Sequence, residues 1–265
     1  MCTVSFVKTN GKIIITSNRD EKIIRPNAIE PKNYHINHKK IIFPKDNKAG
    51  GTWYAIDEHS NVLVLLNGAE EKHTLKNSYR KSRGLIVLDL ISSESPLEAW
   101  NAIDLDNIEP FTLVLFENQK LYQLRWDELE KSTLELDTNQ SHIWSSSTLY
   151  SKEIREKRAN WFSTFLDTQP EVNEEELFNF HRYTEVDNNE HGLVINRNDV
   201  LKTLSITQTV IEKNKVSIHY NDLMRLADEY HEVEKLLRKM VTSSLILSQE
   251  RMESIQFETA LQRYH

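Results

Sequence analysis

The chain has 265 residues, of which 38% are hydrophobic and 28% charged, and its net charge is −7. This length can bury a sizeable core without covalent cross-links, and an acidic chain with interspersed charges is atypical of nucleic-acid-binding proteins. Its single cysteine, Cys2, excludes internal disulfides and cysteine-based metal motifs. No run of 18 apolar residues occurs and the first ten residues lack signal-peptide features, so we expect a cytoplasmic protein without a transmembrane helix.

The first predicted element is a β-hairpin. β-Branched and apolar runs over residues 3–7 and 12–17 flank the Asn-Gly pair at 10–11, which is the strongest short hairpin signal. A two-residue turn makes the numbers of opposed residues add up to 21. Cys2 is then expected opposite Arg19 on the same face of the sheet, where the positive charge would favour a thiolate.

The remaining elements alternate between strands and helices. Strands are expected over residues 41–43, 52–56, 62–66, 111–117, 121–126, 204–211 and 215–219. Helices are expected over residues 82–92, 96–103, 152–166, 173–183 and, from apolar residues at helical spacing, 221–240. This order predicts sheets covered by helices, forming one domain over residues 1–220 with a C-terminal helical extension over 221–265.

Cys2 is a candidate nucleophile because removal of Met1 would place it at the N-terminus. The α-amino group, with an ordinary pKa near ~8, can take the proton of a thiol whose ordinary pKa is about 8.5. The thiolate is the reactive form, so one residue would supply both nucleophile and base. The alternative, which position alone favours, is a small hydrophobic residue at the start of a strand.

Glycine is scarce and clustered in this chain. Only six glycines occur, against about 18 at average usage. Four of them, Gly50, Gly51, Gly68 and Gly84, fall within one short region. We therefore expect them where backbone geometry requires glycine, and residues 50–84 are a second candidate functional region.

Several short motifs, in this order, resemble those of the NRDE family, the transport and Golgi organisation protein 2 group. The motifs are Met1-Cys2-Thr3, Asn18-Arg19-Asp20-Glu21, Gly50-Gly51-Thr52-Trp53, Asn67-Gly68 and Ser82-Arg83-Gly84. They cover residues 1–90 well and the remainder loosely. The resemblance implies an α+β fold of the N-terminal nucleophile hydrolase type, an αββα sandwich in which two stacked antiparallel sheets lie between helical layers. Relatives with an N-terminal cysteine include bile-salt hydrolases, penicillin V acylases and acid ceramidase, which cleave C–N amide bonds.

The resemblance also implies roles for individual residues. Cys2 would be the nucleophile, Asp20 would hold its α-amino group, Arg19 would stabilise the thiolate, and Asn67 would donate to the tetrahedral oxyanion. The implied substrate-binding residues are Asn18, Gly50, Gly51, Thr52, Trp53 and Ser146. The implied activity is hydrolysis of an amide bond in a small acylated substrate, without a metal or cofactor.

Three features depart from the amidase pattern. Arg19 and Asp20 are adjacent rather than three residues apart, and adjacent side chains of a strand face opposite ways. Ser146 stands where the matching segment typically carries Asn, and Leu204 stands where some relatives carry Arg. An incomplete set of residues is compatible with another substrate or with no hydrolysis. Ser146, the supply of aromatic residues (five Trp, nine Tyr and nine Phe) and the available histidines leave open the alternative of a non-enzymatic haem or lipid binding or trafficking protein that uses the same cleft. Haem would then be bound non-covalently, and a homo-oligomer is compatible with either function.

Overall fold

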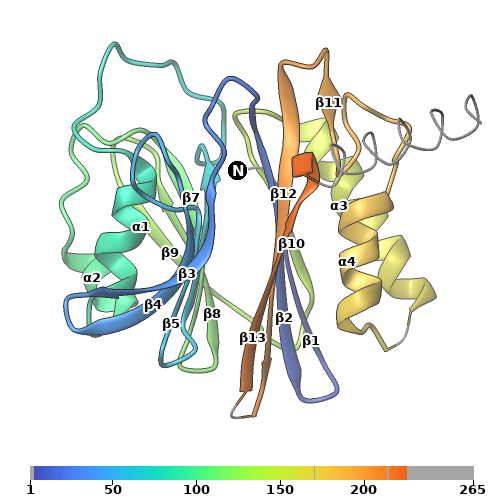
Figure 1. Ribbon diagram of the computed structural model, residues 1–265, viewed down its shortest axis with the longest axis horizontal. Coiled ribbons are helices and arrows are strands. Elements are labelled where there is room, and N and C mark those ends of the chain that lie inside the picture. The colour runs from blue at the N-terminus through green and yellow to red at the C-terminus, as the bar shows by residue number, and fades with distance from the viewer. Residues whose placement is uncertain (1–2, 170, 214, 226–265) are drawn as a thin grey trace, which may run out of the picture. The chain divides into compact units, whose positions relative to one another are not determined.

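The computed structural model describes residues 3–169, 171–213 and 215–225. The chain divides into two compact units, residues 1–221 and 222–265. In the first unit two antiparallel sheets face each other, and helices cover the outer face of each sheet (Figure 1). The predicted αββα sandwich is therefore confirmed.

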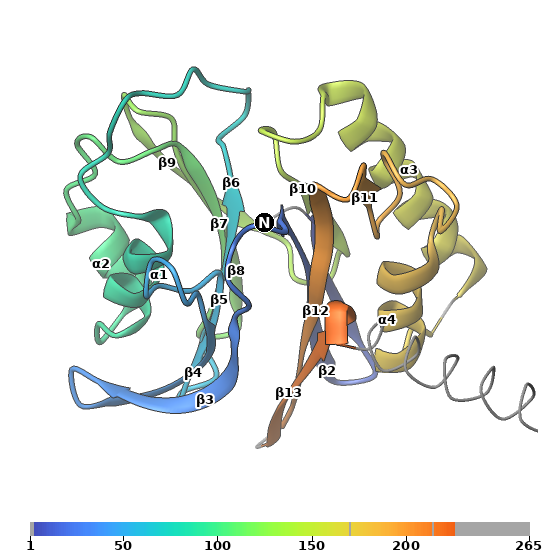
Figure 2. The same cartoon turned by 45° about the horizontal axis from the view of Figure 1, so that its top comes forward.

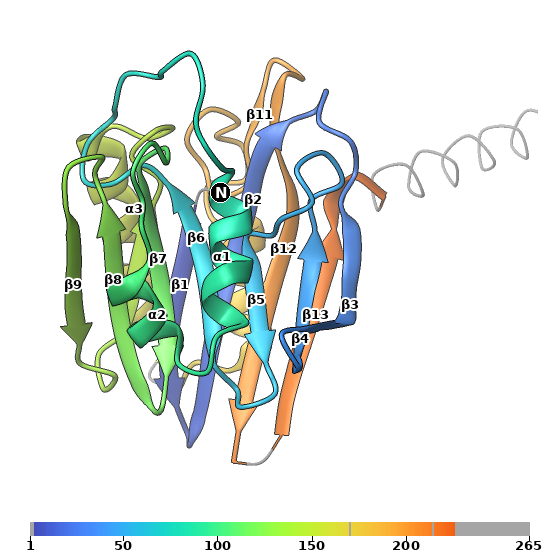
Figure 3. The ribbon, with the colours of Figure 1, turned by 90° about the vertical axis from the view of Figure 1, so that its left-hand side faces the viewer.

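The larger sheet has seven antiparallel strands in which spatial order follows chain order. The strands are β3 (Ile29–Ile36), β4 (Lys39–Lys45), β5 (Tyr54–Asp57), β6 (Val62–Asn67), β7 (Phe111–Glu117), β8 (Lys120–Trp126) and β9 (Lys131–Leu136). Two helices lie in front of this sheet in Figure 3, where α1 (Arg83–Ile91) contacts β5 and β6, and α2 (Pro96–Ala102) contacts β7.

The smaller sheet has six strands, in the order β10-β1-β2-β12-β11, with β13 also paired to β12. The strands are β1 (Thr3–Thr9), β2 (Lys12–Lys22), β10 (His142–Ser145), β11 (Asn196–Arg197), β12 (Leu201–Glu212) and β13 (Lys215–Asp222). Its outer face is covered by α3 (Lys152–Thr168) and α4 (Glu174–Tyr183), as Figure 2 shows. The Asn18–Glu21 motif lies at the end of β2 and Asn67 at the end of β6, so the two motifs come from the two facing sheets.

The β1–β2 hairpin has the predicted turn and register. Asn10 and Gly11 have φ angles of +47° and +75°, as the mirror-image hairpin turn requires. Thr3 pairs with Asn18, which confirms that opposed residue numbers add up to 21. The expected pair of Cys2 with Arg19 lies outside the described residues.

Alternation along this hairpin sends side chains into two separate cores. One set lies between the sheets and joins the larger core: Val4, Phe6, Ile13 and Ile15. The other set packs beneath α3 and α4: Val7 and Ile14, against Phe162, Leu177 and Phe180. Each of these positions is nearly inaccessible to water, and full burial of such a side chain contributes about 1.5–3 kcal/mol. Burial on both faces therefore fixes the register of β1 and β2.

Four of the observed strands lie outside the predicted set: β3, β9, β10 and β11. β3 and β9 are the two edge strands of the larger sheet, and most of their side chains are exposed or half-buried. Such strands lack the apolar run that marks a central strand.

The predicted extension over 221–265 lies almost wholly outside the described residues. Within the described part of the chain, no helix is both long and apolar enough to cross a membrane.

Candidate active site

A cavity of about 260 Å³ lies between the end of β2, the end of β6 and the start of α1. We call it the Arg19 pocket. It brings together four of the sequence motifs, and its lining includes Arg19, Glu21, Gly51, Thr52, Trp53, Asn67, Arg83 and Gly84. Residues separated by more than sixty positions in the sequence therefore form one site.

Arg19 is the most deeply buried charged residue of this pocket, with 2% of its surface exposed. Its Nη2 donates to Asp46 Oδ2 at 3.2 Å, and its guanidinium lies 4.2 Å from the centroid of the Trp53 ring. Burial lowers the pKa of Arg19, and the nearby carboxylates of Glu21 and Asp46 only partly oppose this effect. The chain thus holds a poorly hydrated cation at the pocket wall, where it can stabilise an anion strongly.

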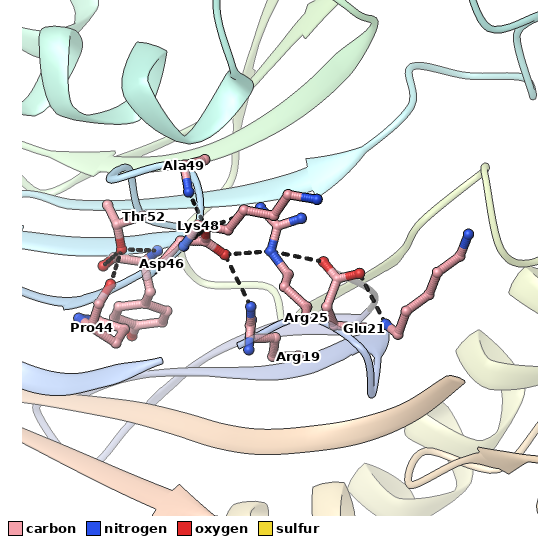
Figure 4. Close-up of polar contacts among 10 residues, drawn as sticks. Arg19, Glu21, Arg25, Pro44, Asp46, Lys48, Ala49 and Thr52 are labelled. Carbon is pink, nitrogen blue, oxygen red and sulfur yellow. Dashed lines mark hydrogen bonds and ion pairs between the residues drawn. The ribbon is translucent and has the colours of Figure 1, made fainter. Parts of the chain in front are cut away.

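Asp46, which follows β4, joins Arg19 and Arg25, two of the arginines that line this pocket, as Figure 4 shows. It accepts hydrogen bonds from Arg25 Nε at 2.6 Å and from the backbone N–H of Ala49 at 2.7 Å. Burial alone would raise the pKa of Asp46, but the hydrogen bonds from Arg25 and Ala49 hold it below its ordinary value. Asp46 is therefore an ionised anchor that fixes the directions of Arg19 and Arg25.

The glycines of the motifs occupy positions that other residues would strain. Gly50 and Gly68 have φ angles of +74° and +85°. A Cβ on Gly51 would lie 2.3 Å from the backbone carbon of Gly84, and the Thr52 N–H donates to the Gly84 oxygen at 3.0 Å. Gly50 and Gly68 thus have backbone angles that favour glycine, and Gly51 and Gly84 lie too close to other backbone atoms for a side chain. The expectation that backbone geometry requires glycine at these four positions is confirmed. Gly50 itself is not among the residues that line the Arg19 pocket.

Asp20 points away from the Arg19 pocket, as strand alternation predicts. Its Oδ2 accepts from the Tyr150 hydroxyl at 2.7 Å and its Oδ1 from the Thr203 hydroxyl at 2.5 Å. The pairing of β12 with β2 shifts here at a β-bulge. Thr203 is opposite Asp20 and Ser205 is opposite Arg19, so Leu204 has no partner in β2. The carboxylate of Asp20 is thus buried and held through both oxygens.

Asn18 also lies on the outer face, beneath α4. Its Nδ2 donates to the Leu193 backbone oxygen at 2.7 Å, and its Oδ1 is 2.6 Å from His181 Nδ1. His181 Nε2 lies 2.7 Å from Ser5 Oγ. Burial lowers the pKa of His181 to about 3, and the charge of Arg158 adds to the effect. The structure therefore does not bring Asn18, a predicted substrate-binding residue, to the pocket, and instead places it in a buried network that supports the hairpin.

Ser146 connects the Arg19 pocket to a second cavity. Its hydroxyl donates to the backbone oxygen of Asn67 at 2.7 Å, and only 1% of its surface is exposed. Thr3, the first described residue of β1, pairs with both Asn18 and Ser145. The described beginning of β1 is thus flanked by Asn18, which precedes Arg19, and by Ser145, which precedes Ser146. Cys2 lies outside the described residues.

Arg25, Asp46 and Glu109 also line the pocket, and none of the three was predicted from the sequence. Arg83, from the Ser82-Arg83-Gly84 motif, donates to Glu109 at 3.0 Å, and burial lowers its pKa. Only Asp46 had a sequence signal, because an aspartate shortly before a Gly-Gly pair is typical of a turn.

Among the described residues no group of three or more histidine, cysteine or acidic side chains could hold a metal ion.

Solved structures share this arrangement of sheets and helices at low sequence identity. The Caenorhabditis elegans ortholog of N-acylethanolamine-hydrolyzing acid amidase matches with a TM-score of 0.57 and 11% identity, over 81% of this chain and 94% of that chain. A mutant of the conjugated bile acid hydrolase from Clostridium perfringens matches with a TM-score of 0.52 and 10% identity, over 85% and 93% of the two chains. The fold is therefore that of N-terminal nucleophile amidohydrolases.

No curated protein matches the sequence. The model of the family described as Transport and Golgi organisation 2 matches residues 1–230, which include the motifs that line the Arg19 pocket and all of the described residues. The chain belongs to the Transport and Golgi organisation 2 family.

Proposed function

We propose that the protein is a cysteine N-terminal nucleophile amidohydrolase that cleaves the C–N amide bond of a small acylated substrate. Cys2, freed by removal of Met1, is the nucleophile. The observation that carries this proposal is the buried Arg19, which lines a pocket and directly follows Asn18, the residue paired with the described beginning of β1. A nucleophilic thiolate needs such an electropositive neighbour.

The geometry of the neighbouring residues supports a division of labour. Arg19 is fixed by Asp46 and Trp53 on the inner face, where it stabilises the thiolate. Asp20 is fixed by Tyr150 and Thr203 on the outer face, where it orients the α-amino group. The adjacency of Arg19 and Asp20 is then compatible with the chemistry, because the two groups act on opposite sides of one terminal residue.

The reaction proceeds in two steps. The Cys2 thiolate attacks the amide carbon, and Asn67 donates to the oxyanion that forms. The C–N bond then breaks, the leaving amine takes a proton from the α-ammonium group, and a thioester remains. The α-amino group next removes a proton from water, whose oxygen attacks the thioester carbon. The C–S bond breaks, and the carboxylic acid leaves as the thiolate is restored.

Intact mass measurement with a thiol-reactive probe at neutral pH tests the nucleophile directly. We expect Met1 to be absent and Cys2 to be labelled once, and faster than a free thiol. Arg19→Leu should slow the labelling, since the thiol loses its positive neighbour. Arg80→Leu is a matched control, because Arg80 forms a half-exposed ion pair with Asp104. Retained Met1, or labelling no faster than that of a free thiol, contradicts the proposal.

The alternative of haem or lipid binding or trafficking stays a prediction. A haem titration at stoichiometric protein tests its haem version, because histidine or cysteine ligation changes the Soret band. An unchanged band would exclude haem as a specific ligand. Release of a free amine from a panel of N-acyl compounds by wild-type protein, and not by Cys2→Ala, would support the hydrolase.

A further inference from the structure

The second cavity, of about 420 Å³, lies between β10 of the smaller sheet and β7 and β8 of the larger sheet. We call it the Arg125 pocket. Its lining includes apolar residues of both sheets, namely Leu66, Leu136, Ile143 and Trp144, and two arginines, Arg125 and Arg155. No aspartate or glutamate is among the described residues that line this cavity, in contrast to the Arg19 pocket. The lining thus supplies Arg125 and Arg155 itself, whereas the carboxylates that contact these two arginines come from outside the lining.

Three buried donors in the lining have no hydrogen-bond partner among the described residues. They are Arg125 Nε, Arg155 Nε and Ser145 Oγ. Arg125 comes from β8 and Arg155 from α3, so the two arginines belong to different layers of the sandwich. An unsatisfied buried donor costs about 1–3 kcal/mol, so two N–H groups and one hydroxyl around one cavity point to a missing acceptor.

The chain itself shows which acceptor these arginines take. The carboxylate of Glu70, in the loop after β6, forms an ion pair with Arg125 and lies 3.7 Å from Arg155 Nη1. The Glu70 side chain is 61% exposed, so it can leave without disturbing the core. Planar guanidinium groups match carboxylates well, so a ligand carboxylate would find the same partners that Glu70 contacts.

We propose that the Arg125 pocket binds the carboxylate-bearing part of the ligand, with Arg125 and Arg155 as its charge partners and the apolar residues of its lining in contact with an adjoining hydrocarbon group. This inference rests on the proposed function for its substrate class, which becomes an N-acylated compound with a free carboxylate. Ser146 lines the Arg125 pocket and bonds to Asn67 of the Arg19 pocket. One extended ligand would thus contact both cavities.

Calorimetric titration of the full chain carrying Cys2→Ala tests binding without turnover. N-octanoylglycine and N-octanoylethanolamine are matched probes, because they share an acyl chain and differ in a carboxylate against a hydroxyl. We expect the glycine conjugate to bind at least tenfold more tightly. Arg125→Gln and Arg155→Gln should each weaken its binding roughly ten- to a hundredfold, the usual loss for a charge-assisted hydrogen bond, and leave the ethanolamine conjugate unaffected.

Glu70→Gln separates ligand binding from a purely structural role of the arginines. The substitution removes the internal competitor at an exposed position, so it should tighten binding of N-octanoylglycine while the fold is unchanged. Arg80→Gln, at a half-exposed ion pair elsewhere, should leave both affinities unaltered. Equal affinity for the two probes, or no gain from Glu70→Gln, overturns the inference. Fast Cys2 labelling with no carboxylate preference would reject only this inference, whereas a carboxylate preference with an unreactive Cys2 would reject only the hydrolase.

Discussion

His181 predicts a specific loss of stability in mild acid. The imidazole is fully buried beneath α4, and its pKa of about 3 lies well below the ordinary value of 6.5. The unfolded chain therefore binds a proton at this residue at a pH where the folded chain does not. Stability from this group is complete above pH ~6.5 and falls as the pH drops towards the folded-state value.

The size of the effect at pH 5 depends on the unfolded-state pKa alone, because the folded-state value is much lower. Protonation of an imidazole with an ordinary pKa stabilises the unfolded chain at pH 5 by about 2 kcal/mol. The folded chain gains almost nothing at that pH. We therefore expect His181 alone to reduce the free energy of unfolding by about 2 kcal/mol between pH 8 and pH 5.

Urea unfolding of wild type and His181→Gln at both pH values isolates this contribution. All other titrating groups contribute to both proteins, so they cancel in the difference between the two pH dependences. His38→Gln is the control, because His38 is exposed in the turn between β3 and β4, and it should retain the wild-type dependence. An equal pH dependence in wild type and His181→Gln would refute the assignment of a neutral, buried imidazole.

Two further substitutions test how the Arg19 pocket is built. Asp46→Asn leaves the cations of Arg19 and Arg25 without their shared anion, so urea unfolding at pH 7 should show a loss of about 3 kcal/mol, while Glu135→Gln at an exposed pair should change little. A loss of under about 1 kcal/mol for Asp46→Asn would contradict the role of this carboxylate as an anchor. Gly51→Ala places a methyl group against the Gly84 backbone and should cost about 1–3 kcal/mol or more; thermal melting that matches wild type would show that the contact relaxes freely.

The sequence determined the elements whose causes are local. The Asn-Gly pair at 10–11 sets the β1–β2 turn because both residues tolerate positive φ. The start of α4 is likewise local, since Asn173 and Glu176 form a reciprocal capping box. Alternation along β2 assigned Arg19 and Asp20 to opposite faces, and the hydrogen-bond partners of the two side chains confirm this.

The residues that those two faces contact depend on tertiary packing. Asp46 reaches Arg19 from another sheet, and strand periodicity carries no information about contacts between sheets. The bulge at Leu204 is set by β12 against β2, and one inserted residue changes register without a sequence signal. Arg125 and Arg155 converge from a strand and a helix of different layers. Local sequence therefore accounts for the hairpin and for the faces of its residues, whereas the packing of one layer on another sets the pockets and the charges inside them.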